Sequence, residues 1–320
     1  MPGPVGARRT GPFHYDRRMA EEFCDVGRGV TLCYETFGDP DDPPILLIMG
    51  LATQMIAWHE DLCEQLAERG FYVVRFDNRD IGRSTHLDFR PPSVKQMLTR
   101  RLNPEQYSLS DMAEDTAVLL RELEIAPAHV VGASMGGMIG QMLAAEHPEL
   151  VRSLTSIMST TGSRRHGQPA LSVYRYLLKP PPRDRDGYIQ RSAEIFGLVG
   201  STGFERDEQY IRERAARSFD RGFDVRAGGR QLGAIVASGD RTKSLGRIKA
   251  PTLVIHGTVD KMIRPSGGRA TAKAIPGARL MMIEGMGHDL PRGVWPQLIE
   301  AISEHAKAAD GARAHTEAAA

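Results

Sequence analysis

The sequence predicts an α/β protein built on a mostly parallel central sheet flanked by helices. Short apolar or alternating runs recur along the chain between segments of helical periodicity, which is typical of parallel strands joined by helices. Ile45–Met49 and Thr252–His256 are also largely apolar, as expected for strands that are buried on both faces. A chain of 320 residues can bury such a core without a disulfide or a metal to stabilise it.

Turn-forming and helix-ending residues lie where several of the expected elements end. Gly38-Asp39-Pro40 forms a turn after the first strand, Gly70 lies at the expected end of the first helix, and Pro148 ends a later helix. We expect Ser110 to cap the helix that it begins. The expected strands are Val30–Phe37, Ile45–Met49, Tyr72–Phe76, His129–Val131, Val151–Met158, Thr252–His256 and Arg279–Ile283. The expected helices are Trp58–Arg69, Ser110–Glu124, Gly136–His147, Ser266–Ile275 and Val294–His305.

The sheet pattern is interrupted between residues 159 and 246. Arginine and aromatic residues become frequent there, β-branched runs disappear, and Pro180-Pro181-Pro182 separates three or four helical stretches. We therefore expect a helical insertion at 159–246 within a core formed by 21–158 and 247–307. Residues 1–20 are rich in Gly, Pro and Arg and residues 308–320 are rich in Ala, and we expect both ends to be flexible tails.

Charge, hydropathy and cysteine content exclude several classes of protein. The formal charge is only +1, whereas a nucleic-acid-binding protein would normally have a strong basic excess. No run approaches the roughly 18 apolar residues of a membrane span, and no secretory signal is recognisable. Cys24, Cys33 and Cys63 are odd in number and lack C-x-x-C spacing, which predicts reduced thiols and a cytoplasmic location. A Cys24–Cys33 bridge is the alternative.

The sharpest functional motif is Gly132-Ala133-Ser134-Met135-Gly136. It lies between an expected strand and an expected helix, the context in which G-x-S-x-G forms a nucleophile elbow. The tight turn puts the serine in a strained backbone conformation at a helix N-terminus, and side chains two positions to either side would collide. The motif predicts Ser134 as a catalytic nucleophile, against the alternative of an incidental serine in a glycine-rich turn.

A serine nucleophile needs a base and a group that orients the base. His288 follows the last strand in a glycine-flanked loop, so it should lie at the same sheet edge as Ser134. Asp260 follows the preceding strand, whereas Asp289 is too close in sequence to orient the His288 ring easily. The order Ser134, Asp260, His288 matches the α/β-hydrolase chain order. The remaining histidines considered are assigned to helix ends, strands or tails: His129, His147, His256, His305 and His315.

From Glu22 to Lys307 the chain resembles the α/β-hydrolase superfamily. Ile48-Met49-Gly50-Leu51, the segment Phe76–Ser84 and Gly285-Met286-Gly287-His288 look like the aclacinomycin methylesterase branch of actinobacterial carboxylesterases. The segment Ser134–Gln141 is also similar to that of 3-oxoadipate enol-lactonases. The resemblance implies an α/β-hydrolase fold in which residues 159–246 form a helical cap that closes the pocket and supplies most of the specificity.

The resemblance also implies that the Leu51 backbone N–H is one oxyanion donor, and the Met135 N–H next to the nucleophile is the other. Many relatives carry His-Gly where this chain has Met49-Gly50; because both donors are backbone groups, the missing histidine should not disable the hole. The expected pocket residues are mainly apolar and methionine-rich, which suits a bulky acyl or alkoxy group. They are Gly50, Leu51, Trp58, Met135, Met138, Met262 and Met286; the alternative is that the methionines only fill the core.

Asp77-Asn78-Arg79-Asp80 resembles a catalytic or metal-binding cluster but is interpreted as an ion-paired structural loop. No spacing of His, Cys or carboxylate residues suggests a metal site, and no dinucleotide-binding motif follows a strand, so we expect neither metal nor cofactor.

The sequence thus predicts a serine hydrolase of small, largely apolar carboxylic esters, active as a monomer or homodimer without nucleic-acid or membrane partners. Four alternatives share the fold: a lactonase, a carbon–carbon hydrolase, a cofactor-free haloperoxidase and a non-catalytic ligand receptor. An aspartate nucleophile, as haloalkane dehalogenation requires, is excluded by Ser134.

Overall fold

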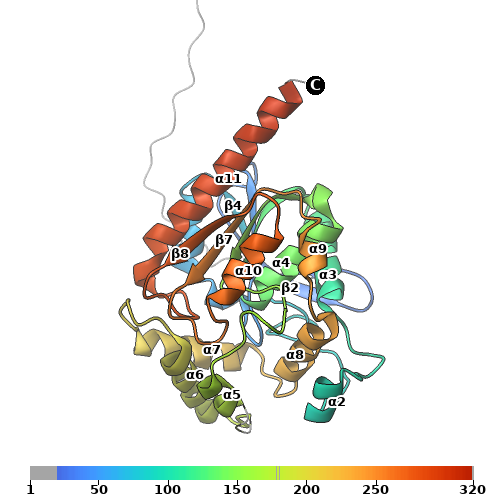
Figure 1. Cartoon of the computed structure of the whole chain (residues 1–320), viewed down its shortest axis with the longest axis vertical. Helices are drawn as coiled ribbons and strands as arrows, with labels where there is room; N and C mark the ends of the chain where they lie inside the picture. Colours follow the sequence, from blue (N-terminus) through green and yellow to red (C-terminus); the bar gives the residue numbers. More distant parts are fainter. Residues whose placement is uncertain (1–19, 178, 180, 319–320) are drawn as a thin grey trace, which may run out of the picture.

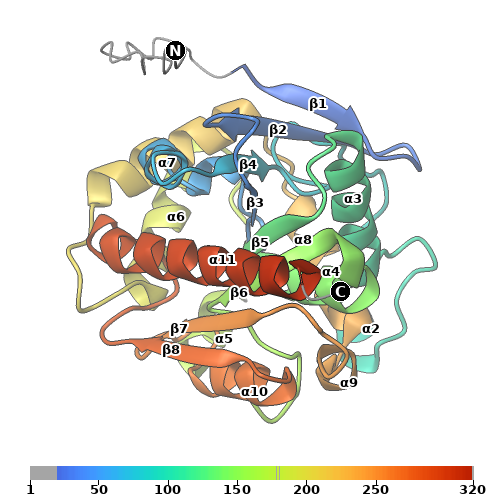
Figure 2. The same cartoon turned by 90° about the horizontal axis from the view of Figure 1, so that it is seen from above.

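The computed structural model describes residues 20–177, 179 and 181–318 (Figure 1). Their strands form one eight-stranded sheet in the order β1-β2-β4-β3-β5-β6-β7-β8 (Figure 2). In this order, the first strand pairs antiparallel with the second and the second pairs antiparallel with the third. All the other neighbouring pairs are parallel, so the predicted mostly parallel sheet is confirmed. The strands are β1 (Glu22–Asp25), β2 (Thr31–Phe37), β3 (Pro44–Ile48), β4 (Tyr72–Phe76), β5 (Ala128–Ala133), β6 (Val151–Ile157), β7 (Thr252–Gly257) and β8 (Arg279–Ile283).

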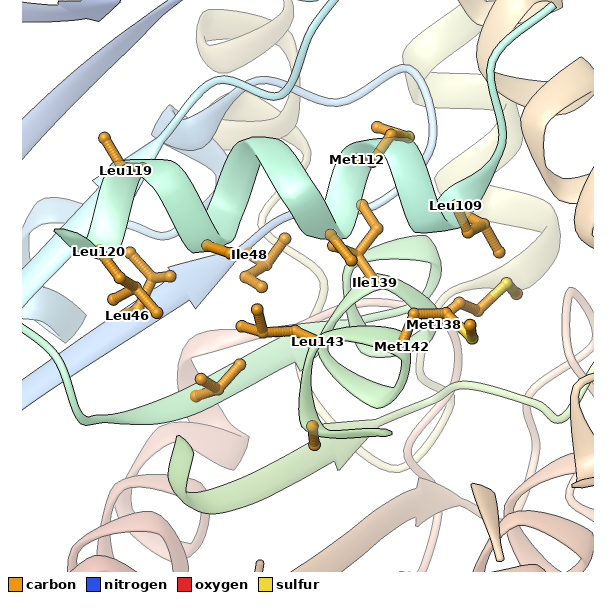
Figure 3. Packing of buried hydrophobic residues seen from close by; sticks show 14 of the residues in the cluster. Leu46, Ile48, Leu109, Met112, Leu119, Leu120, Met138, Ile139, Met142 and Leu143 are labelled. Carbon is orange, nitrogen blue, oxygen red and sulfur yellow. The ribbon is translucent and has the colours of Figure 1, made fainter. Parts of the chain in front are cut away.

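Helices cover both faces of the sheet. Strand β3 is buried throughout, and its alternate residues enter two different apolar clusters, as the two-residue period of a strand requires. Leu46 and Ile48 face the side of α3 (Leu109–Glu122) and α4 (Met135–Glu146), whose packed side chains are drawn in Figure 3. Helix α10 (Ser266–Ala274) lies on that side too, while α1 (Glu60–Ala67) and α11 (Trp295–Ala318) cover the other face (Figure 2).

A helical segment joins β6 to β7, and all of its helices except the last lie at one end of the sheet (Figure 1). It contains α5 (Leu171–Leu177), α6 (Arg185–Val199), α7 (Glu208–Arg221), α8 (Ala227–Ser238) and α9 (Thr242–Leu245). Its backbone meets the loop that follows β8, where the His288 N–H donates to the Val199 carbonyl at 2.8 Å. Helices α5–α8 therefore lie at the carboxyl ends of the parallel strands, whereas α9 packs against α4 and α10. We refer to α5–α9 and their connections as the cap.

Two helix ends differ from the prediction. Ser108, not Ser110, caps α3, because Asp111 at the third helical position completes a reciprocal capping box with it. The last helix runs to Ala318 instead of ending near His305, so the described part of the predicted tail at 308–320 is helical. Alanine favours helix, and Asp310 is bound by His129 Nε2 at 3.2 Å and by Arg152. The predicted tail at 1–20 lies outside the described residues except for its last position.

Several shorter elements were not predicted. They are strand β1, helix α2 (Val94–Thr99) and three 3₁₀ turns at Met55–Ala57, Pro148–Leu150 and Arg292–Val294. The position of strand β1 also shows that Cys24 and Cys33 do not form a disulfide. Cys24 lies opposite Leu32 and Phe23 lies opposite Cys33, so the two cysteines point to opposite faces of the sheet and all three thiols are free. No helix in the described part of the chain is long and apolar enough to cross a membrane.

Candidate active site

Ser134 lies in a sharp turn between β5 and α4. Its backbone has φ 56° and ψ −117°, a combination that a residue with a side chain rarely adopts. A Cβ on Gly132 would come within 2.2 Å of the Gly136 carbonyl oxygen, and one on Gly136 within 2.1 Å of the Ile48 oxygen. Glycine is therefore required at both positions, and the strained turn holds Ser134 at the N-terminus of α4, beside the end of β3.

Ser134, His288 and Asp260 form one chain of hydrogen bonds. His288 Nε2 lies 2.9 Å from Ser134 Oγ, and His288 Nδ1 lies 2.8 Å from Asp260 Oδ2. Because a carboxylate can only accept, Nδ1 carries the proton and Nε2 is free to accept the serine proton. The three residues come from loops after β5, β7 and β8, so the structure brings together the side chains that the sequence singled out.

The Asp260 carboxylate is fixed from several sides. Its Oδ1 accepts the backbone N–H groups of Met262 at 2.8 Å and Ile263 at 2.9 Å, and the side chain is fully buried. The His256 ring lies next to the Asp260 carboxylate, and its Nε2 donates to the Ile263 carbonyl at 2.8 Å. Burial lowers the pKa of His256, which keeps this ring neutral. The sequence analysis predicted only that His256 lies in a strand. In the structure the His256 ring binds Ile263, a residue of the turn that holds Asp260.

Asp289 has a separate structural role. Its Oδ1 accepts hydrogen bonds from the N–H and hydroxyl of Ser201, and the Ser201 Oγ in turn accepts the Gly287 N–H at 2.9 Å. Burial raises the pKa of the Asp289 carboxyl. Asp289 therefore ties the loop that carries His288 to the cap, and Asp260 is the carboxylate that contacts the ring, as expected.

Two backbone N–H groups beside Ser134 are free to bind an anion. A Cβ on Gly50 would lie 3.0 Å from Ser134 Cβ, which places the segment after β3 against the serine. Neither the Leu51 N–H nor the Met135 N–H has an acceptor among the residues that the structure describes. Met135 is the first residue of α4, where the N–H group has no partner within the helix and the helix dipole favours negative charge.

Residues 43–291 match the family model described as the alpha/beta hydrolase fold. The chain belongs to the α/β-hydrolase family. Rhodomycin D methylesterases of Streptomyces sp. (strain C5) and Streptomyces peucetius are each 33% identical to it, over 88% of this chain and 96% of the relative. The predicted resemblance to methylesterases is therefore confirmed.

Solved structures agree on the fold of this α/β hydrolase. The enol-lactonase from Burkholderia xenovorans LB400 superposes with a TM-score of 0.70 and 23% identity, covering 89% of this chain and 99% of the other. The bromoperoxidase from Bacillus anthracis has a TM-score of 0.68 and 22% identity, covering 90% and 100%. Proteins with different activities thus share this arrangement of strands and helices, so the fold alone does not select one reaction.

The residues expected to line the pocket of this hydrolase differ in their exposure. Leu51 and Met262 are partly buried at the edge of the core, and Met138 is 4% exposed. Trp58, Met135 and Met286 are 0% exposed. A side chain with no accessible surface contacts no space large enough for a water molecule, so these three are packed core residues and not open walls. The loop around Met286 is closely packed, since a Cβ on Gly257 would lie 2.1 Å from the Met286 oxygen.

The Asp77–Asp80 loop is ion-paired, as interpreted from the sequence, but mostly to the cap. Asp77 pairs with Arg221 of α7 at 3.0 Å, and Asp80 pairs with Arg230 of α8 at 2.7 Å. Arg79 pairs instead with Asp115 of α3. No group of three or more His, Cys, Asp or Glu in the described part of the chain is arranged to hold a metal ion. The loop thus attaches the cap of this hydrolase to its sheet.

Sequence reasoning missed the polar cap residues that reach the core. They are Gln231, Arg221, Arg230 and Ser201. Gln54, on the core side, is also absent from the predicted site and donates to the Ser218 and Gly222 carbonyls of the cap. Each lies more than 80 positions along the chain from its partner, and no local pattern signals contacts of that range.

Proposed function

We propose that this protein hydrolyses carboxylic esters, with Ser134 as nucleophile, His288 as general base and Asp260 as the group that orients the base. The observation that carries the proposal is the pair of hydrogen bonds at 2.9 Å and 2.8 Å that links the three side chains. The strained turn at Ser134 supports it, because strain of this kind is retained where it serves chemistry. The methylesterase relatives support the same reaction class.

In the acylation step, Ser134 Oγ attacks the ester carbonyl while His288 Nε2 takes the hydroxyl proton. The new C–O bond pushes the carbonyl electrons onto oxygen, and the N–H groups of Leu51 and Met135 bind that oxyanion. One such donor contributes about 3 kcal/mol to the transition state. When the tetrahedral species collapses, the alkoxy oxygen leaves with the proton from His288 and the acyl group stays on Ser134.

In the deacylation step, water replaces the alcohol. His288 removes a proton from the water as it attacks the acyl carbonyl, the same two N–H groups bind the oxyanion, and Ser134 Oγ leaves with the proton that His288 returns. Asp260 stabilises the imidazolium in both steps because its buried carboxylate accepts a hydrogen bond from the Nδ1–H group. The reaction requires no metal or cofactor.

Methyl esters are the substrate class that we propose. The support is the 33% identity to two methylesterases across nearly the whole of both chains. We further propose a reducing, cytoplasmic location, supported by three free and buried thiols. Burial raises the pKa of Cys33 and Cys63 to about 12, so neither forms a thiolate readily. A monomer or homodimer remains our prediction for the assembly.

Ser134→Ala tests the proposal. It should lower hydrolysis of p-nitrophenyl acetate and of a panel of methyl esters by at least about 10³-fold, because the nucleophile is lost. Ser153→Ala is the matched control, since Ser153 is also a buried serine but contacts His129 and lies outside the site. Equal rates in Ser134→Ala and wild type would refute the proposal, and turnover of lactones without turnover of methyl esters would redirect it.

A further inference from the structure

The segment Gly50–Thr53 holds the Leu51 N–H beside Ser134, and several of its other polar groups form hydrogen bonds. The Thr53 N–H donates to the Gly50 carbonyl at 3.3 Å, and the Thr53 hydroxyl donates to the Leu51 carbonyl at 3.0 Å. Ala52 has φ 54°, in the left-handed region that favours glycine. A non-glycine residue there carries about 1 kcal/mol of strain or more, so something must hold the turn in this form.

A side chain from the cap holds it. Gln231 of α8 is 0% exposed, and its Oε1 accepts the Ala52 N–H at 2.8 Å. Its Nε2 donates to the Arg79 carbonyl at 2.9 Å. The Ala52 N–H can only donate and the Arg79 carbonyl can only accept, so the two partners fix which way the amide points. Both ends of the buried amide are satisfied, and it bridges the loops that follow β3 and β4.

Helix α8 is placed to make this contact. A Cβ on Gly228 would lie 3.2 Å from Ala52 Cβ, so the glycine allows the helix to approach the turn closely. Arg230, next to Gln231, forms a fully buried pair with Asp80 at 2.7 Å. The helix is therefore anchored to the sheet one residue away from the glutamine, which leaves Gln231 little freedom to move.

We propose that Gln231 is a positioning residue for the oxyanion hole. By holding the Ala52 N–H, it fixes the preceding peptide so that the Leu51 N–H points at the oxygen that becomes negative when Ser134 attacks. The cap thereby assembles part of the catalytic site in addition to covering it. This inference rests on the proposed ester hydrolysis and adds a residue to it.

Gln231→Leu tests the inference, with Gln106→Leu as its matched control. Gln106 also joins α8 to the core, donating to the Arg230 carbonyl at 3.0 Å, but it does not contact Gly50–Thr53. Gln231→Leu should lower kcat for a p-nitrophenyl ester about 10- to 100-fold with KM changed less than about threefold, since an oxyanion donor acts only in the transition state. Gln106→Leu should leave kcat within about threefold of wild type.

A second measurement separates positioning from general disruption. A trifluoromethyl ketone forms an oxyanion on the serine, so Gln231→Leu should weaken its inhibition about as much as it lowers kcat, while inhibition by the parent carboxylic acid stays unchanged. If Gln231→Leu does not fold, the unbranched Gln231→Met is measured in the same way. Equal kcat losses in the Gln231 and Gln106 variants would overturn the inference. An inactive wild type would instead overturn the proposed function.

Discussion

Two turns that meet at Ser134 are held in opposite ways. The elbow Gly132–Gly136 follows β5, the segment Gly50–Thr53 follows the neighbouring strand β3, and each contains a non-glycine residue at positive φ. The elbow is fixed by its own glycines and by the adjoining strands, with the Ser134 N–H donating to the Ile157 carbonyl at 2.9 Å. The segment after β3 is held by Gln231, which lies 179 positions away in the cap.

The two turns therefore differ in where their supporting residues come from. The elbow is held by residues close to it in the sheet and in α4, whereas Gly50–Thr53 is held by a residue far along the chain. The contacts that fix the elbow come from β3, β6 and α4. The strained form of Gly50–Thr53 is instead held by a hydrogen bond from the Ala52 N–H to Gln231 of α8. A change in the cap can therefore alter the Leu51 side of the oxyanion hole and leave the Met135 side intact.

The largest expected effect comes from breaking the anchor of α8. Arg230→Met leaves Asp80 charged, fully buried and without its guanidinium partner, which should cost about 3–5 kcal/mol in the free energy of unfolding. Urea unfolding measures the change. Arg226→Met is the matched control, because Arg226 is half-exposed and pairs with the largely exposed Asp88 at 3.4 Å and with Asp224 at 3.5 Å, so its loss should matter by less than about 1 kcal/mol. Similar losses in both variants would mean that Arg230 does not anchor the cap.

The elbow can be disturbed from within. Gly136→Ala would place a Cβ 2.1 Å from the Ile48 oxygen, so strand β3 or helix α4 must shift. We expect a loss of about 1–3 kcal/mol in the free energy of unfolding, together with most of the esterase activity. Gly140→Ala, one turn further along α4, meets only side-chain methyl groups at 3.1 Å and should cost less. A Gly136→Ala enzyme with wild-type kcat would show that the elbow tolerates a wider turn.

The same contrast explains what the sequence could predict. Gly132, Gly136 and Ser134 stand within five positions of one another between a strand and a helix, so the elbow follows from local pattern and steric reasoning. His288 and Asp260 could be chosen because parallel strands deliver their loops to one edge. Gln231 could not be chosen from the sequence, because its role depends on how α8 docks. That docking is set by side-chain packing between distant segments.

Some of the residues expected to line the pocket are core residues for a related reason. Trp58 and Met286 have the right residue types and lie in loops at the right edge, but packing around them leaves no accessible surface. Residue type and position along the chain specify the neighbourhood of a side chain and not the direction it faces. The end of α11 shows the same limit, since Asp310 gains its partners His129 and Arg152 only in the folded chain.

The smallest expected effect tests the strain in the turn itself. Glycine adopts the backbone conformation of Ala52 without strain, so Ala52→Gly should release about 1 kcal/mol that the Gln231 hydrogen bond otherwise offsets. In the wild-type background kcat should hardly change. In the Gln231→Leu background the same substitution should raise kcat about threefold to fivefold, because the turn can form again without the glutamine. Steady-state kinetics on the four enzymes measures this coupling. If Ala52→Gly restores nothing in that background, the strain at Ala52 is not what displaces the Leu51 N–H, and Gln231 must act through its bridge to Arg79 instead.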